Sequence, residues 1–195
     1  MDENKEALLR LLDEFQNKKI LVLGDIIIDE NNYGEAMGLS LDSPAIKLKH
    51  LKTDISQGGA GNVVKHLLEL GAKTSFITLV GEDQFSDFIK NWKHPNLNLF
   101  ALSEPERKAI VKRRFWSGHY KILELEHLEI CDMLQETSEK VLEIVKNEMN
   151  NYDVIIFQDQ VHGFFSNDLI EKLKELTKGK IVLANSQTYL KPANH

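Results

Sequence analysis

The sequence has 195 residues, 42% of them hydrophobic, which is enough for one domain with a sizeable core. Its formal net charge is -6 and it has no long Lys/Arg block, so we expect a small-molecule ligand and no nucleic-acid partner. A charged start and the lack of long apolar runs predict a cytoplasmic protein with no membrane partner. The single cysteine, Cys131, cannot form an internal disulfide, and its apolar neighbours predict that it is buried.

The first elements are a helix and a strand that ends in an acidic residue. Leucines at helical spacing predict an amphipathic helix over residues 5–17. The apolar run 19–23 predicts a buried parallel strand that brings Asp25 to its carboxyl end, with Asp29 four residues later. Asp25 is open to two interpretations, a turn-forming residue or, with Asp29, one of two acceptors for sugar hydroxyls. We favour the second for at least one of the two.

Residues 30–52 change pattern and predict a β flap. Turn residues surround an alternating segment at 45–51, which is typical of an antiparallel excursion with one polar face. Residues 108–116 and 120–126 predict a hairpin that could pair with the flap. A small sheet of this kind must cover its apolar face, so we expect a symmetric homodimer through it.

A glycine-rich turn at residues 57–62 opens the next helix. Its glycines let the backbone approach a ligand, and the free amides of the helix start favour a hydroxyl-rich or anionic molecule. The alternative is a tight turn that only lets helix and sheet pack. Neither Walker A nor GxGxxG spacing is present, and the polar run 52–56 before the turn disfavours a dinucleotide site.

The remaining elements alternate between strand and helix. Strands are predicted at 73–80, 96–101, 154–157 and 181–183, and the helix at 134–149 is expected to turn Leu134, Val141, Ile144 and Val145 inward. This rhythm predicts an α/β fold with a doubly wound, mostly parallel sheet and a small antiparallel β lid.

The order of these motifs resembles the ribokinase-like (PfkB) carbohydrate kinases. The matching stretches are Gly24-Asp25 with Asp29, residues 58–62 at the helix start, Leu70-Gly71-Ala72, and residues 79–83. Within that family the turn at 41–45 and the basic hairpin 112–126 are similar to the heptose-7-phosphate kinase domain of bifunctional ADP-heptose synthases. The resemblance implies a Rossmann-like core with lid segments at about 30–52 and 107–126.

The resemblance also implies roles for single residues. Such kinases transfer the γ-phosphoryl group of ATP to a sugar hydroxyl, with Mg²⁺ expected for the complete enzyme. Hydroxyl ligands and the backbone that approaches the sugar ring would be Asp25, Asp29, Asn62, Gly58 and Gly59. Arg114 would contact a phosphate on the substrate, although a solvated lid surface explains it equally well.

Two departures concern the nucleotide side. His162 stands where the family has a lysine, and an imidazole is neutral much of the time, which disfavours phosphate binding in the family's manner. Residues 185–187 replace an Asp-Pro-Lys-type turn, and Asn185 is the candidate to face the nucleotide phosphates.

The sequence contains no Gly-Ala-Gly-Asp loop, which in the family supplies the catalytic base and the anion hole. We therefore expect residues 1–195 to be an incomplete ribokinase-like domain without catalytic residues and without turnover. The alternatives are a non-catalytic module that binds sugar phosphates and a dimerisation unit built on the lid.

Overall fold

Two β-sheets organise the chain in the computed structural model, which describes residues 3–187. The larger sheet has the order β5-β4-β1-β8-β9, and every neighbouring pair of its strands is parallel. Its strands are β1 (Lys19–Gly24), β4 (Lys73–Val80), β5 (Leu97–Ser103), β8 (Val154–Asp159) and β9 (Ile181–Ser186). The predicted α/β fold with a mostly parallel main sheet is therefore confirmed.

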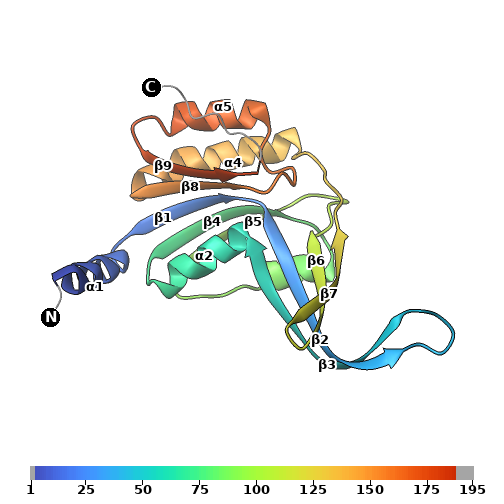
Figure 1. Ribbon diagram of the computed structural model, residues 1–195. Helices are drawn as coiled ribbons and strands as arrows, with labels where there is room; N and C mark the ends of the chain where they lie inside the picture. Colours follow the sequence, from blue (N-terminus) through green and yellow to red (C-terminus); the bar gives the residue numbers. More distant parts are fainter. Residues whose placement is uncertain (1–2, 188–195) are drawn as a thin grey trace.

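Helices cover both faces of the main sheet (Figure 1). Alternate residues of β1 serve the two sides: Val22 packs in a core with α2 and α3, and Leu21 packs in a second core with α4 and α5. The helices are α2 (Ala60–Glu69), α3 (Gln84–Lys90), α4 (Gln135–Glu148) and α5 (Asn167–Leu176), and a 3₁₀ turn spans Met149–Asn151. This arrangement is the doubly wound pattern that the sequence predicts.

The smaller sheet is the lid, which projects from the main body (Figure 1). Its order is β3-β2-β6-β7, with β2–β3 and β6–β7 antiparallel and β2–β6 parallel, so the lid sheet is mixed. The lid strands are β2 (Ile26–Leu39), β3 (Ile46–Gly59), β6 (Val111–Ser117) and β7 (Tyr120–His127). The predicted hairpin and its pairing with the flap are both confirmed, but the prediction of an antiparallel lid is wrong for the central pair, because β2 and β6 run parallel.

The polar run 52–56 is part of strand β3, although its polarity does not predict a strand. Polar residues are tolerated there because this part of the lid sheet is largely solvent-exposed. β3 pairs with β2 in antiparallel fashion, whereas a dinucleotide turn follows a parallel strand. The dinucleotide interpretation therefore fails on topology and not on polarity.

Two predicted burial states are wrong. Cys131 is exposed, and Leu134 is 51% exposed, whereas Val141 and Val145 are fully buried as predicted. Residues 128–134 connect the lid to α4 over the surface, so Leu128, Ile130 and Leu134 stay exposed, while Met133 packs partly buried against the core. Helix α1 (Glu3–Phe15) forms at the predicted place, with Leu8, Leu9 and Leu11 exposed.

None of the helices in the described part of the chain is both long enough and apolar enough to span a membrane.

Candidate functional site

The first strand of the main sheet passes into the lid at Gly24–Asp25, where the glycine-rich turn meets it. The backbone oxygen of Asp25 accepts a hydrogen bond from the amide of Ala60, the first residue of α2, at 2.9 Å. Gly59 has a φ of 58°, and a Cβ there would lie 2.6 Å from that same oxygen. Only glycine fits this close approach. The acid-bearing strand end and the glycine turn are therefore adjacent, as the sequence suggests.

The carboxylate of Asp25 is turned inward. Asp25 is only 6% exposed. Its Oδ2 accepts hydrogen bonds from the amides of Gln160 (3.0 Å) and His162 (3.3 Å), and its Oδ1 accepts one from Phe164 (3.1 Å). Burial raises the pKa of Asp25, and the three backbone donors oppose that shift. The structure thus gives this carboxylate three backbone partners in the loop after β8.

Asp29, Gly58 and Arg114 come together at the base of the lid. Asp29 Oδ1 pairs with Arg114 Nη1 at 2.6 Å across β2 and β6. A Cβ added to Gly58 would lie 2.2 Å from Asp29 Oδ2, so the carboxylate rests directly against the bare backbone of β3. These three residues, far apart in the sequence, form one cluster in which the carboxylate and the guanidinium are half-buried and the carboxylate covers the buried backbone of Gly58.

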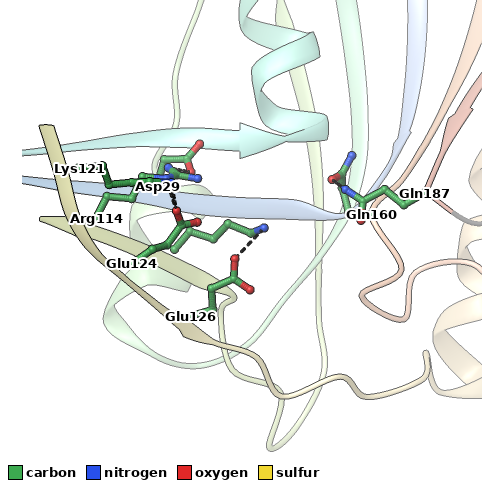
Figure 2. Close-up of polar contacts among 8 residues, drawn as sticks. Asp29, Arg114, Lys121, Glu124, Glu126, Gln160 and Gln187 are labelled. Carbon is green, nitrogen blue, oxygen red and sulfur yellow. Dashed lines mark hydrogen bonds and ion pairs between the residues drawn. The ribbon is translucent and has the colours of Figure 1, made fainter. Parts of the chain in front are cut away.

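Further charged pairs continue this cluster along the same face of the lid (Figure 2). Glu124 lies opposite Arg114 and pairs with it and with Lys121, while Glu126 pairs with Lys112 at 3.1 Å. Burial lowers the pKa of Arg114, but its pairing with Asp29 and Glu124 raises that pKa overall. We call this set of six charged residues the polar face of the lid; its members are Asp29, Lys112, Arg114, Lys121, Glu124 and Glu126.

The opposite face of the lid holds an ion pair that sequence reasoning missed. Glu30 is buried and accepts two hydrogen bonds from Arg113, at 2.6 and 2.8 Å, and one from Asn32 at 2.9 Å. The bidentate bond to Arg113 holds the pKa of Glu30 below its usual value. Strand alternation was the available signal, because it places Glu30 and Arg113 on the face away from Asp29 and Arg114.

Asn62 and Asn185 are not brought into these clusters. Asn62 is exposed in the first turn of α2, and Asn185 is exposed on edge strand β9. Beside Asn185, Gln187 donates a hydrogen bond to Gln160 at 2.8 Å, which links the ends of β9 and β8 (Figure 2). The structure therefore groups Asp29, Gly58 and Arg114 but leaves both asparagines without a contact to that group among the interactions described for residues 3–187.

His162 occupies the loop after β8. It is only 8% exposed, and within the described part of the chain its Nδ1 has no hydrogen-bond partner. The imidazole lines a small cavity together with Asp25 and Arg107. A buried imidazole does not present an exposed cation to a phosphate, as a lysine side chain can.

Residues 3–187 contain no group of three or more His, Cys, Asp or Glu side chains arranged to hold a metal ion.

Relatives with similar sequences are bifunctional proteins longer than this chain. Bifunctional protein HldE of Campylobacter curvus is 30% identical over 183 residues, which cover 90% of this chain and 38% of that protein. The same protein of a Nitratiruptor species is 27% identical over 177 residues, covering 90% of this chain and 37% of the relative. The chain thus spans less than two fifths of the length of these relatives.

Solved structures with a similar fold include sugar kinases. Phosphofructokinase-2 from Escherichia coli in complex with fructose-6-phosphate matches with a TM-score of 0.67 at 12% identity, over 88% of this chain and 55% of that one. A possible 1-phosphofructokinase from Thermotoga maritima matches with a TM-score of 0.68 at 14% identity, over 86% and 53%. The family model described as pfkB family carbohydrate kinase matches residues 17–109. Residues 17–109 are therefore similar to the pfkB family of carbohydrate kinases, and the described chain has the fold that these phosphofructokinase structures share.

Proposed function

We propose that this chain is the sugar-binding and lid portion of an ATP-dependent carbohydrate kinase whose substrate is a sugar phosphate such as D-glycero-D-manno-heptose 7-phosphate. The family match and the relatives named HldE support a sugar kinase. The observation that carries the proposal is the cluster of Asp29, Gly58 and Arg114 at the base of the lid.

Each member of this cluster has a chemical task in sugar recognition. The carboxylate of Asp29 accepts hydrogen bonds from sugar hydroxyls, and Gly58, which has no side chain, leaves room for that carboxylate. The guanidinium of Arg114 suits a phosphate oxygen pair, and its ion pair with Asp29 holds both side chains in place before the ligand arrives. Gly59 contributes indirectly, because its positive φ and missing side chain allow the backbone turn that places Gly58.

ATP supplies the transferred phosphoryl group in this proposal, and the complete kinase would use Mg²⁺. Asn185, exposed at the end of β9, is the residue of this chain that would face the nucleotide phosphates. Since the sequence holds no Gly-Ala-Gly-Asp loop, we expect the 195-residue chain to bind sugar phosphate without catalysing turnover.

Calorimetry with heptose 7-phosphate and with unphosphorylated heptose tests the sugar site. Arg114→Met should weaken binding of the phosphorylated sugar by about tenfold or more and leave the other nearly unchanged, whereas Asp29→Asn should weaken both. Lys172→Met, on the exposed face of α5, is the matched control and should bind the sugars like the parent chain. Equal binding by Arg114→Met and the parent chain would contradict the assignment, and sustained ADP release with ATP and magnesium would contradict the expected lack of turnover.

A second candidate function, dimerisation through the lid, is favoured by exposed apolar residues on the face opposite Asp29. Strand register places Ile55, Leu123 and Leu125 on the same side as Glu30, and all three are exposed. Covering them with a second copy would remove apolar surface from water. Sedimentation should show a dimer that Leu125→Glu converts to monomer; a monomer across a wide concentration range would exclude this candidate.

A further inference from the structure

The loop after β8 has an irregular backbone that depends on a distant carboxylate. Val161 has a φ of 63°, which is rare for a β-branched residue, and Gly163 has a φ of 94° with the Cys131 oxygen only 2.0 Å from where a Cβ would lie. The amides of residues 160, 162 and 164 leave the strand ladder and converge on the carboxylate of Asp25. Without that acceptor, three largely buried donors would lose their partner.

Asp25 is also the residue at which the main sheet becomes the lid. β1 ends at Gly24 and β2 begins at Ile26, so Asp25 is the single residue between the two strands. Its amide donates to Gln158 of β8 at 3.3 Å, and its carbonyl accepts from Ala60 at the start of α2 at 2.9 Å. One residue therefore connects the first strand of the lid, the glycine turn and the loop after β8.

The segment that leads from the lid back to the main body also contacts the loop after β8. The amide of Met133, in the segment that follows β7, donates to the Gly163 carbonyl at 2.9 Å. Arg107, which precedes β6, donates to the carbonyl of Cys131 at 2.7 Å and pairs with buried Glu104 at 2.8 Å. The segment after β7 thus bonds to the loop 160–164 directly, and the segment before β6 is linked to it through Cys131, whose carbonyl lies against Gly163.

We infer that Asp25 is a positioning residue: by holding loop 160–164 it fixes the orientation of the lid, and with it Asp29 and Arg114, relative to the carboxyl edge of the main sheet. It acts on sugar binding without touching the sugar. The claim about sugar binding rests on the proposed function, whereas the claim about the lid does not.

The test compares Asp25→Asn with Asp29→Asn, the same chemical change four residues along the chain. An amide at position 25 keeps one acceptor oxygen and turns the other into a donor, so at least one of the three loop amides loses its acceptor. Hydrogen exchange of the Gln160, His162 and Phe164 amides should accelerate by about tenfold or more in Asp25→Asn and remain unchanged in Asp29→Asn.

Lid orientation is measured separately by the distance between two spin labels. One label is attached through His119→Cys on the exposed lid turn and the other through Lys172→Cys on exposed α5, both in a Cys131→Ser background. The distance distribution should broaden in Asp25→Asn and stay narrow in Asp29→Asn. Binding of heptose 7-phosphate should weaken in both variants. Only in Asp25→Asn should the weaker binding be accompanied by a broadened distance distribution.

A second pair of variants covers the case in which Asp25→Asn does not fold. Gln160→Pro removes one backbone donor to Asp25, and Gln160→Ala changes the same side chain but keeps the donor. The proline variant alone should broaden the lid distances. Unchanged amide protection and lid distances in Asp25→Asn, or in Gln160→Pro if the first variant is unfolded, would overturn the inference. If the parent chain binds no sugar phosphate, the proposed function fails, while exchange and distances still decide the role of Asp25.

Discussion

The main sheet and the lid sheet contrast in what holds their strands together. In β1 every residue after Lys19 is buried, and apolar side chains pack on both faces. In β7 every residue except Glu124 is exposed, and ion pairs from Glu124 and Glu126 join it to β6 across the strand pair. Burial of apolar surface stabilises a sheet with little dependence on pH, whereas partly exposed ion pairs respond to both pH and salt. The lid should therefore be the region that responds to solution conditions.

Strand β2 changes along its length from apolar burial to solvent exposure. Ile26, Ile27 and Ile28 are buried in the main body, and the strand is exposed from Glu35 onward. Asp29 and Glu30 lie between these two parts, where each carboxylate is shielded and paired with an arginine. Asp29, the residue proposed to bind sugar hydroxyls, thus lies between the buried part of β2 and the exposed part, which we expect to respond to pH and salt.

The largest expected difference in stability between the two sheets comes from apolar burial. Phe76→Ala removes a fully buried ring from the main core and should lower the free energy of unfolding by about 3–5 kcal/mol. Leu125→Ala on the lid, where the side chain is 44% exposed, should cost less than about 1 kcal/mol. Denaturant titration measures both. Similar losses in the two variants would contradict the contrast.

The next effect is expected at the junction of the two sheets. Gly59→Ala forces a Cβ to within 2.6 Å of the Asp25 oxygen at a positive φ, and should cost about 2–3 kcal/mol. Gly118→Ala, in the lid turn, has a similar φ of 56° but open space around the new Cβ, and should cost about 1 kcal/mol. The difference in melting temperature between the two variants measures the cost of the steric clash at Gly59, apart from the cost of the positive φ. Equal shifts in melting temperature would show that the junction is not tightly packed.

The pH response of the lid depends on Glu30. Arg113 holds the pKa of Glu30 below its unfolded value, so this stabilisation is complete above about pH 4.3 and is lost as the pH falls through the lower folded value. Glu30→Gln should cost about 1–2 kcal/mol at neutral pH and reduce the acid sensitivity of β2 and β6. Hydrogen exchange read strand by strand, from neutral pH down through the carboxylate range, checks this. An unchanged acid response in the variant would assign it to another group.

The smallest effect is expected for exposed charges on the main body. Lys172→Met breaks an exposed pair with Asp168 on α5 and should change stability by less than about 0.5 kcal/mol. Lys112→Met removes a partly buried partner of Glu126 on the lid and should have the larger effect, one that shrinks at high salt. Denaturant midpoints at low and high ionic strength measure both. A larger effect at Lys172 would reverse the proposed order.

Local sequence patterns were sufficient for the order of the elements but not for the length of β3, whose polar run 52–56 carries no strand signal. The strand at 19–23 and the hairpin around residue 118 form as predicted, whereas the glycine-rich residues 57–62 form the end of β3 and the start of α2. Exposure in the linker at Cys131 was missed, because apolar neighbours in a sequence do not show whether the segment crosses the surface.

The sequence by itself determined an α/β chain with a β lid, because periodicity and turn chemistry act over a few residues. Only the tertiary structure decided that Asp25 faces inward to the loop after β8 while Asp29 faces Arg114. The two aspartates look alike in the sequence, and their partners lie 85 to 139 residues further along the chain. Contacts at that separation are set by the packing of whole strands, which no local pattern encodes.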